Sequence, residues 1–156
     1  MKRQLAPALV LIALALGCGS SAHARKLGAA TFNDHGTKDA SGQARIELEA
    51  DNYYFSPTFV RGKPGQKLTV TIKNESGTTH NFSATTAGVA TDIPAHGSVE
   101  IAVTLPPSGV LAFFCKYHSG QGMNGELLVG SASPQDAGSQ LPGAPAPSQN
   151  VPYRAY

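Results

Sequence analysis

Hydrophobic and polar residues alternate in short segments of this chain between residues 45 and 130, and two short apolar runs complete the pattern. In the first segment, Ile46, Leu48 and Ala50 would lie on one face of an extended strand, with charged residues on the other face. Alternation with a period of two is typical of half-buried β-strands, and no segment keeps the 3.6-residue period of an amphipathic helix. The predicted strands are residues 45–51, 68–73, 99–105, 110–114 and 126–129.

Turn-forming residues separate these strands. Proline restricts φ and glycine admits positive φ, so segments rich in both favour tight turns. The turns are residues 62–65, 75–77, 94–97 and 106–109. Short strands joined by such turns predict an all-β domain, either a β-sandwich or a barrel. The aromatic residues expected in its core are Tyr53, Tyr54, Phe55, Phe59, Phe82, Phe113 and Phe114.

Two segments of different composition flank the predicted domain at residues 45–130. Residues 25–44 are small, polar and turn-rich, which predicts a loose or partly docked N-terminal arm. Residues 131–156 are rich in Pro, Ser, Gly, Gln and Ala and carry almost no charge. Such a segment buries too little apolar surface to offset its ordering entropy, so we expect a disordered tail.

The first 24 residues have the layout of a signal peptide. Lys2 and Arg3 precede an apolar run at residues 5–16, and an A-x-A pattern ends at Ala24. The run is shorter than the roughly 20 residues that a transmembrane helix needs. We therefore expect cleavage after Ala24 and export to the periplasm, the cell surface or the medium. Processing at Cys18 instead would give a lipoprotein, which is the one route by which we expect membrane attachment.

Removal of residues 1–24 also changes the charge of the chain. It deletes two basic residues and no acidic one, so the formal net charge falls from +2 to zero. The mature chain then has no block of basic residues, which excludes nucleic-acid binding on electrostatic grounds. Cys115 becomes the one cysteine left, so an intramolecular disulfide is ruled out and the thiol needs another use or protection.

Cys115 begins a C-x2-H-x4-M pattern that continues through His118 and Met123 in a glycine-rich loop. Three donors on one short loop between adjacent strands can converge on a point, and a further histidine, His80, stands 35 residues upstream. Two imidazoles, a thiolate and a thioether form the donor set of blue-copper electron-transfer sites, because soft sulfur suits Cu(I) and imidazole suits Cu(II).

The same residues are also compatible with a zinc site or a catalytic thiol. Zinc accepts cysteine and histidine, although thioether ligands are rare at zinc. A catalytic thiol activated by His118 would need an oxyanion hole and an orienting third group, and it leaves Met123 unexplained. The remaining histidines of the arm and the turns, His35 and His96, are expected to be solvated.

The segment around Cys115 resembles the copper loop of the cupredoxin family, with the ligand spacing of its plastocyanin and pseudoazurin branch. The resemblance extends over about residues 45–130 and includes residues 53–57, 62–65 and 80–82. It implies a Greek-key β-sandwich of seven or eight strands with the metal near one end. The acidic patch that plant plastocyanins use for docking has no counterpart here, so the resemblance does not specify the partner.

The resemblance also implies roles for individual residues. His80, Cys115 and His118 would be equatorial ligands of one copper ion and Met123 the axial ligand. Asn81 would link the two ligand-bearing loops by hydrogen bonds. We therefore expect a monomeric one-electron carrier that is not an enzyme and whose redox partner docks near His118. The alternative is an extracytoplasmic copper-binding module that stores, buffers or delivers copper.

Overall fold

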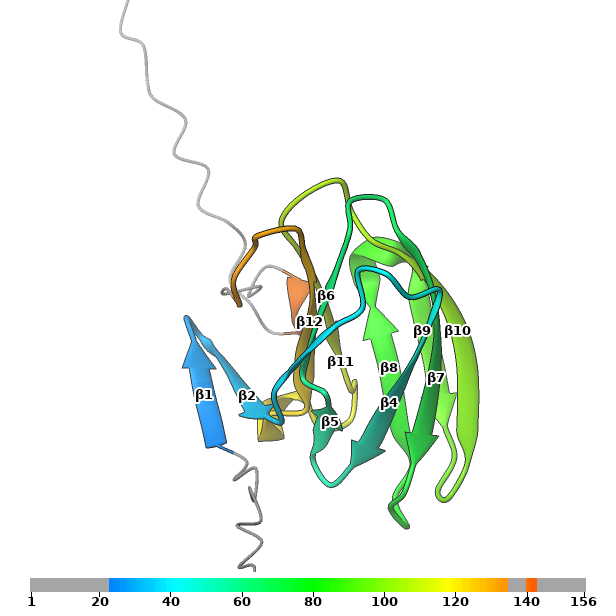
Figure 1. Cartoon of the computed structure of the whole chain (residues 1–156). Helices are drawn as coiled ribbons and strands as arrows, with labels where there is room; N and C mark the ends of the chain where they lie inside the picture. Colours follow the sequence, from blue (N-terminus) through cyan, green and yellow to red (C-terminus); the bar gives the residue numbers. More distant parts are fainter. Residues whose placement is uncertain (1–22, 135–139, 143–156) are drawn as a thin grey trace, which may run out of the picture.

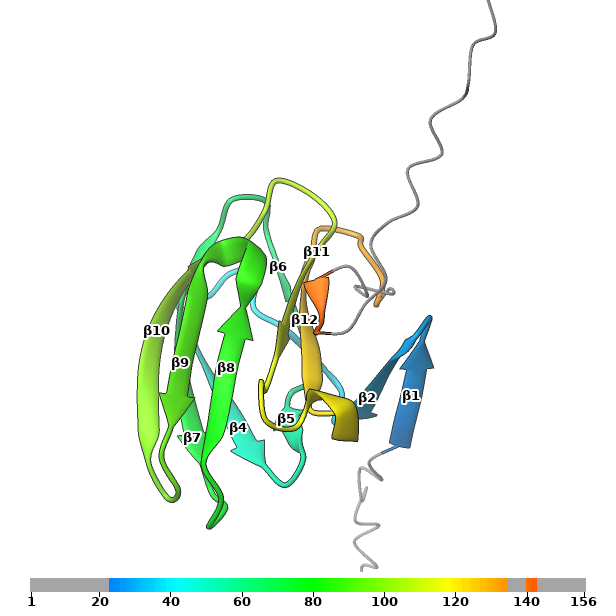
Figure 2. The same cartoon turned by 180° about the vertical axis from the view of Figure 1, so that it is seen from behind.

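The computed structural model describes residues 23–134 and 140–142. This part of the chain forms twelve strands and two short 3-10 turns, and ten of the strands make two packed sheets (Figures 1 and 2). The predicted all-β sandwich is confirmed. None of the described residues lies in a helix long and apolar enough to cross a membrane. Residues 1–22 of the predicted signal peptide, Cys18 included, lie outside the described residues.

The smaller sheet has four strands in the order β10-β7-β4-β5. Its strands are β4 (Arg45–Asp51), β5 (Tyr54–Ser56), β7 (Lys67–Asn74) and β10 (Ser98–Thr104). β4 and β7 run parallel, with Ile46 opposite Val70 and Leu48 opposite Ile72. All four side chains are buried, so the alternating pattern identified the inward face of this sheet correctly.

The larger sheet has six strands in the order β3-β6-β12-β11-β8-β9. Its strands are β3 (Thr37–Asp39), β6 (Phe59–Gly62), β8 (His80–Ala84), β9 (Val89–Ile93), β11 (Val110–Phe114) and β12 (Asn124–Val129). Phe114 at the end of β11 pairs with Asn124 of β12 on one side and Ser83 of β8 on the other. The chain segments that carry the four predicted donors therefore meet at one end of this sheet.

Three phenylalanines fill the core beneath that end. The rings of Phe82 and Phe113 stack with centroids 4.9 Å apart, and Phe55 of the facing sheet meets Phe113 edge-on at 5.2 Å. All three are fully buried. Phe113 packs so closely on β12 that a Cβ at Gly125 would overlap its ring. Because His80 and Cys115 each lie two residues from one of these rings, this packing fixes the backbone on which both stand.

The N-terminal arm predicted at residues 25–44 contains three strands that the sequence pattern did not indicate. β1 (His23–Leu27) and β2 (Ala30–Asp34) form a hairpin, and β3 joins the larger sheet parallel to β6. Phe32 of β2 packs with Phe59 and Leu128 in a cluster separate from the main core. The strand number exceeds the seven or eight that we expected, partly because this arm adds three.

The tail predicted to be disordered is described at residues 131–134 and 140–142, and the rest of it lies outside the described residues. The Gln140 side-chain amide accepts a hydrogen bond from the Ala112 backbone N–H at 2.9 Å and donates to the Val110 carbonyl at 3.3 Å. Leu141 contacts the cluster around Phe32. These residues therefore pack on the sandwich beside β11.

Candidate metal centre

The four predicted donors lie at the end of the sandwich that is lowest in Figure 1. His80 opens β8, and Cys115 follows β11 directly. His118 precedes a 3-10 turn, η2 (Ser119–Gln121), and Met123 stands immediately before β12. Because β11 pairs with both β8 and β12, His80 lies beside the loop although 35 residues separate it from Cys115 in the sequence.

Three of these side chains converge. One ligand atom each from His80, Cys115 and His118 lie within 4.8 Å of one another, and no other such group of three occurs among the described residues. The two imidazoles face each other with their Nδ1 atoms 3.1 Å apart, and the Cys115 Sγ lies 3.5 Å from the His118 Nδ1. His80 and Cys115 are fully buried, whereas His118 is half-buried.

Burial lowers the pKa of both imidazoles, and the neighbouring His118 lowers the pKa of His80 further. Desolvation penalises the charged ring, so the neutral form is favoured at neutral pH. A neutral imidazole has one nitrogen lone pair available for a metal. The electrostatics of the site therefore favour metal binding over protonation.

Ser76 determines which nitrogen of His80 is available. Its Oγ lies 2.9 Å from the His80 Nε2 and also contacts two acceptors, the Asn74 side-chain oxygen at 2.9 Å and the Thr78 carbonyl at 3.1 Å. A hydroxyl has one proton to donate and two lone pairs that accept. When that proton goes to Asn74 or Thr78, the Ser76 Oγ accepts from the His80 Nε2–H, and the inward Nδ1 is left unprotonated, which is the tautomer that a metal ligand at Nδ1 needs. The sequence placed Ser76 only in a turn.

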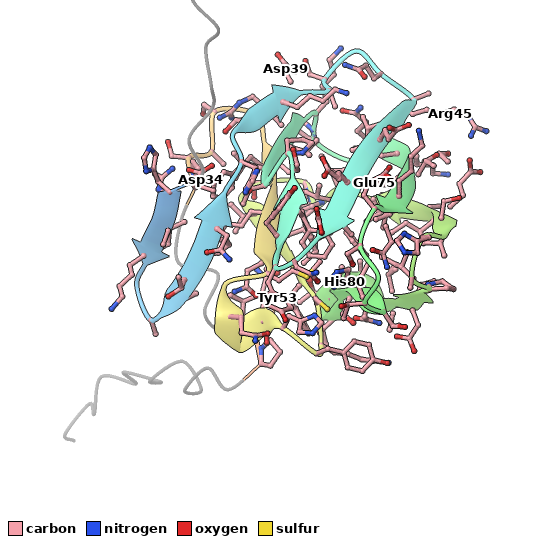
Figure 3. The ribbon with its side chains drawn as sticks, turned by 90° about the horizontal axis from the view of Figure 1, so that it is seen from below. Asp34, Asp39, Arg45, Tyr53, Glu75 and His80 are labelled. Carbon is pink, nitrogen blue, oxygen red and sulfur yellow. The ribbon has the colours of Figure 1, made fainter. Side chains whose placement is uncertain are left out.

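His118 is held from the side by Tyr53. The two rings lie 4.5 Å apart between centroids with an interplanar angle of 42°. Figure 3 shows Tyr53 and His80 at the same end of the molecule, beside the loop that carries η2. The sequence predicted Tyr53 as a core aromatic. The side chain is half-buried and packs against the main core, and its ring also contacts a predicted ligand.

Met123 is fully buried and belongs to the same apolar cluster as Cys115 and Phe113. Its main chain closes the loop, because its N–H donates to the His118 carbonyl at 3.2 Å and its carbonyl accepts from the Cys115 N–H at 3.0 Å. The loop is thus hydrogen-bonded between its first and last predicted ligands. The axial role of the Met123 thioether stays a prediction.

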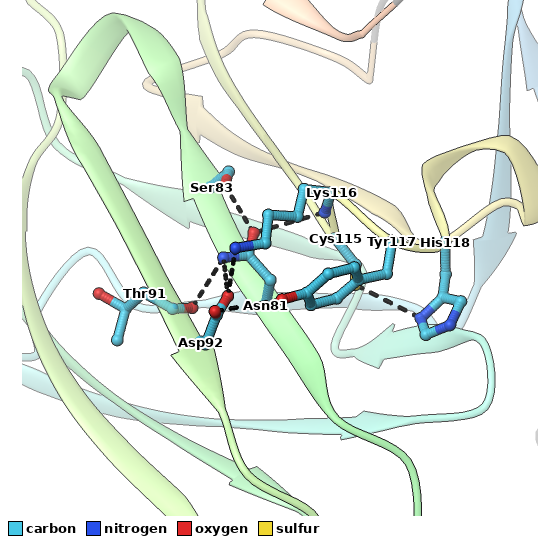
Figure 4. A network of polar contacts seen from close by, with 8 residues as sticks. All are labelled: Asn81, Ser83, Thr91, Asp92, Cys115, Lys116, Tyr117 and His118. Atoms are coloured by element: carbon cyan, nitrogen blue, oxygen red, sulfur yellow. Dashed lines mark hydrogen bonds and ion pairs between the residues drawn. The ribbon is translucent and has the colours of Figure 1, made fainter.

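Asn81 links β8 to the start of the ligand loop (Figure 4). Its side-chain oxygen accepts from the Lys116 backbone N–H at 3.4 Å, and its amide donates to Asp92 at 2.8 Å. Lys116 forms an ion pair with Asp92 at 2.7 Å, and the Tyr117 hydroxyl donates to the same carboxylate at 3.1 Å. The hydrogen bonds from Lys116 and Asn81 hold the pKa of Asp92 below its usual value.

The two remaining histidines of interest lie outside the cluster. His96 is exposed, as expected. His35 is not simply solvated, since its ring stacks on Tyr54 with centroids 3.6 Å apart and its backbone N–H donates to Thr58. The expectation failed because it treated the arm as separate from the sandwich, whereas β2 packs against β5 and brings His35 onto its surface.

The chemistry of the converging donors fits copper. Two imidazole nitrogens and one sulfur are borderline and soft ligands, which suit both oxidation states of that metal. The cluster is enclosed on the side of the core by apolar residues and reaches the surface through His118. Zinc accepts the same three donors, but the additional thioether of Met123 beside them is rare at zinc.

The sequence model of the cupredoxin-like domain family matches residues 8–129 of the chain. No curated protein matches the chain in sequence. Among solved structures, the metal-binding domain of the Cu(I)-exporting P-type ATPase CopA of Streptococcus pneumoniae, determined with Cu(I), is 16% identical with a TM-score of 0.53. The alignment covers 62% of this chain and 97% of that domain.

Two auracyanins are also similar. The dithionite-reduced auracyanin of Roseiflexus castenholzii is 24% identical with a TM-score of 0.48, and the alignment covers 56% of this chain and 98% of that one. Auracyanin A, described as a blue copper protein of Chloroflexus aurantiacus, is 18% identical with a TM-score of 0.45, covering 55% and 98%.

Proposed function

This chain belongs to the cupredoxin-like domain family, and we propose that it is an exported type 1 (blue) copper protein that carries single electrons. The observation that carries the proposal is the convergence of a buried thiol and two imidazoles at one end of the sandwich. A copper ion bound there supplies a one-electron Cu(II)/Cu(I) couple. His80, Cys115 and His118 would hold it, with Met123 as a weak axial ligand.

The contacts around the donors support a carrier because they hold the side chains in place. Ser76 orients His80, the Tyr53 ring packs on His118, and the main chain of Met123 is bonded to that of Cys115. The protein contributes binding, orientation and electrostatics to a redox group. Donors fixed in this way rearrange little when the charge changes by one.

Exposure favours His118 as the route for the electron. It is the one member of the cluster that is not fully buried, and the neighbouring Tyr117 is half exposed at 50%. A partner protein that docks on this surface would come closest to the metal through the His118 ring. We propose a monomer without substrate turnover, exported through the signal peptide predicted at residues 1–24.

The Cys115→Ser variant tests the site. The purified wild-type protein is expected to show the intense sulfur-to-copper absorption of a blue site, which bleaches on reduction. A serine oxygen cannot supply the sulfur orbital, so the variant should lose that band. A variant that keeps copper with the same spectrum would refute the assignment. Loading both proteins with zinc serves as a control, because zinc gives no such band.

A second candidate is copper storage, buffering or delivery. It is favoured by the fold shared with a metal-binding domain of a Cu(I)-exporting ATPase. Redox behaviour separates the two. A carrier should cycle reversibly and exchange electrons rapidly between molecules, whereas a store should bind Cu(I) preferentially and resist reoxidation.

A further inference from the structure

Strand β2 of the N-terminal arm lies directly against the ligand loop (Figures 1 and 3). The contact is made by Asn33. Its backbone N–H donates to the Gly122 carbonyl at 2.9 Å, and its side-chain amide donates to the Gln121 carbonyl at 2.9 Å. One residue of the arm therefore binds the two carbonyl groups that immediately precede Met123.

The contact between Asn33 and Gly122 is close as well as hydrogen-bonded. Gly122 has φ of +94°, and a Cβ placed on it would lie 2.8 Å from the Asn33 side-chain oxygen. A glycine is needed here both for the positive φ and for the approach of β2. The backbone next to Met123 consequently rests on the Asn33 side chain.

The same amide also binds the other side of the site. The Asn33 Nδ2 donates to the Tyr53 carbonyl at 2.8 Å, and the Tyr53 ring packs on His118. Asn33 thus joins the segment that supports one imidazole to the loop segment that carries the predicted axial ligand.

A second side chain also joins β2 to the ligand loop, and here the donor lies on the loop side. Asn124, which follows Met123, donates from its amide to the Thr31 carbonyl of β2 at 2.7 Å and to the Ser119 carbonyl at 2.9 Å. β2 is therefore bonded to the loop on both sides of Met123. An arm that served only to cover the sheet would not need these bonds.

We propose that Asn33 is a positioning residue for the metal centre, which sets the place of Met123 and of the His118 support through its two side-chain hydrogen bonds. The inference rests on the proposed copper site for its redox consequence. Its structural part, the ordering of the loop by β2, concerns the metal-free chain. An altered loop changes the axial side of the site, and axial ligation tunes the reduction potential.

The test compares Asn33→Leu with Gln66→Met in the full mature protein. Leucine keeps the branched shape of asparagine and removes its donors without adding charge. Gln66 is a matched control, because its amide also bonds two carbonyls of the arm region, those of Ala40 and Gln43, at 2.8 and 2.7 Å. It lies on the turn before β7, away from the ligand loop.

Two measurements are made on each variant. In the metal-free protein, Asn33→Leu should speed amide hydrogen exchange at least tenfold at Gly122 and Met123, with Leu48 and Val70 of the core unchanged. In the copper-loaded protein it should change the ratio of Cu(II) to Cu(I) affinity at least threefold. That corresponds to about 28 mV at 59 mV per tenfold for a one-electron couple. Gln66→Met should change neither quantity.

Unchanged exchange at Gly122 and Met123 in Asn33→Leu would overturn the inference. Faster exchange together with an unchanged reduction potential would show that Asn33 orders the loop without affecting the metal, and this result would also overturn the inference. If Asn33→Leu loses protection in the core as well, Asn33→Asp, which keeps size and shape and removes the same donors, decides by the exchange measurement. If the wild-type protein binds no copper, the proposed function fails, and the exchange result still decides whether Asn33 orders the loop.

Discussion

Replacing Ser76 by alanine tests whether one buried hydroxyl controls the metal-binding tautomer of His80. The serine is 6% exposed and its Oγ lies 2.9 Å from the His80 Nε2. Alanine leaves the Nε2–H buried without its acceptor. The ring can then move its proton to Nδ1, the nitrogen that faces His118 at 3.1 Å. Metal binding would have to displace that proton.

The size of the effect follows from the bonds that are lost. A buried donor left without a partner costs about 1–3 kcal/mol, so the free energy of unfolding of the metal-free protein should fall by that amount. Removing the hydrogen-bond partner of a metal-binding histidine typically lowers metal affinity by about 10- to 100-fold. That equals about 1.4–2.8 kcal/mol of binding free energy.

Urea unfolding of the metal-free protein and competition titrations with copper and zinc measure the two quantities separately. Ser83→Ala is the matched control, since Ser83 is also buried and its hydroxyl donates to Asn81, not to His80. We expect it to lose some stability but less than tenfold in metal affinity. If Ser76→Ala loses stability and binds both metals as tightly as the wild type, the reasoning about the tautomer is wrong.

Three other outcomes are expected. Met123→Leu should shift the reduction potential while copper is retained, because the axial bond is weak, and an unchanged potential measured by redox titration would mean that Met123 is not a ligand. Gly125→Ala should lower the free energy of unfolding by about 1–3 kcal/mol, since its Cβ would overlap the Phe113 ring, and urea unfolding that shows no loss would contradict the packing. His35→Gln should remove a pH dependence of stability between about pH 5 and pH 8. Partial burial lowers the pKa of His35, so its contribution is present above its unfolded-state pKa of about 6.5 and is lost as the pH falls through the folded-state pKa. The free energy of unfolding of both proteins is measured at about pH 5 and pH 8. An equal change between the two pH values in variant and wild type would exclude this contribution. The groups facing His35 are the Tyr54 ring and the carboxylates of Glu49, Asp34 and Asp51.

The strands that could be predicted from the sequence are those with alternating burial and two short apolar runs, β11 and β12, which are buried almost throughout. β4 and β7 are buried at alternate positions, so their strands and inward faces were readable from Ile46 or Leu68 onward. β8 is buried at all five positions and shows no alternation. The arm strands are held by backbone pairing and one large apolar side chain, Phe32, which leaves no periodic signal.

The candidate site divides in the same way. Cys115, His118 and Met123 are local in sequence, so a short pattern indicates them, whereas their supports come from distant elements. Ser76 lies on a turn before β8, and Asn33 lies on an arm that composition alone marks as loosely structured. Their side chains make contacts that only the folded backbone brings about, and neither residue is of a type that signals metal binding.

The donors of the proposed centre and the hydrogen bonds that hold them come from different parts of the chain. In the proposed centre the loop would supply the sulfur donors and one imidazole, whereas Ser76 bonds the His80 ring and Asn33 bonds the loop at Gly122. Donor identity therefore fixes which metals can bind. The hydrogen bonds from outside the loop fix how far the donors can adjust when the metal changes oxidation state. Axial ligation tunes the reduction potential, and a partner of a metal-binding histidine tunes metal affinity, so we expect the potential to respond to Asn33 and the affinity to Ser76.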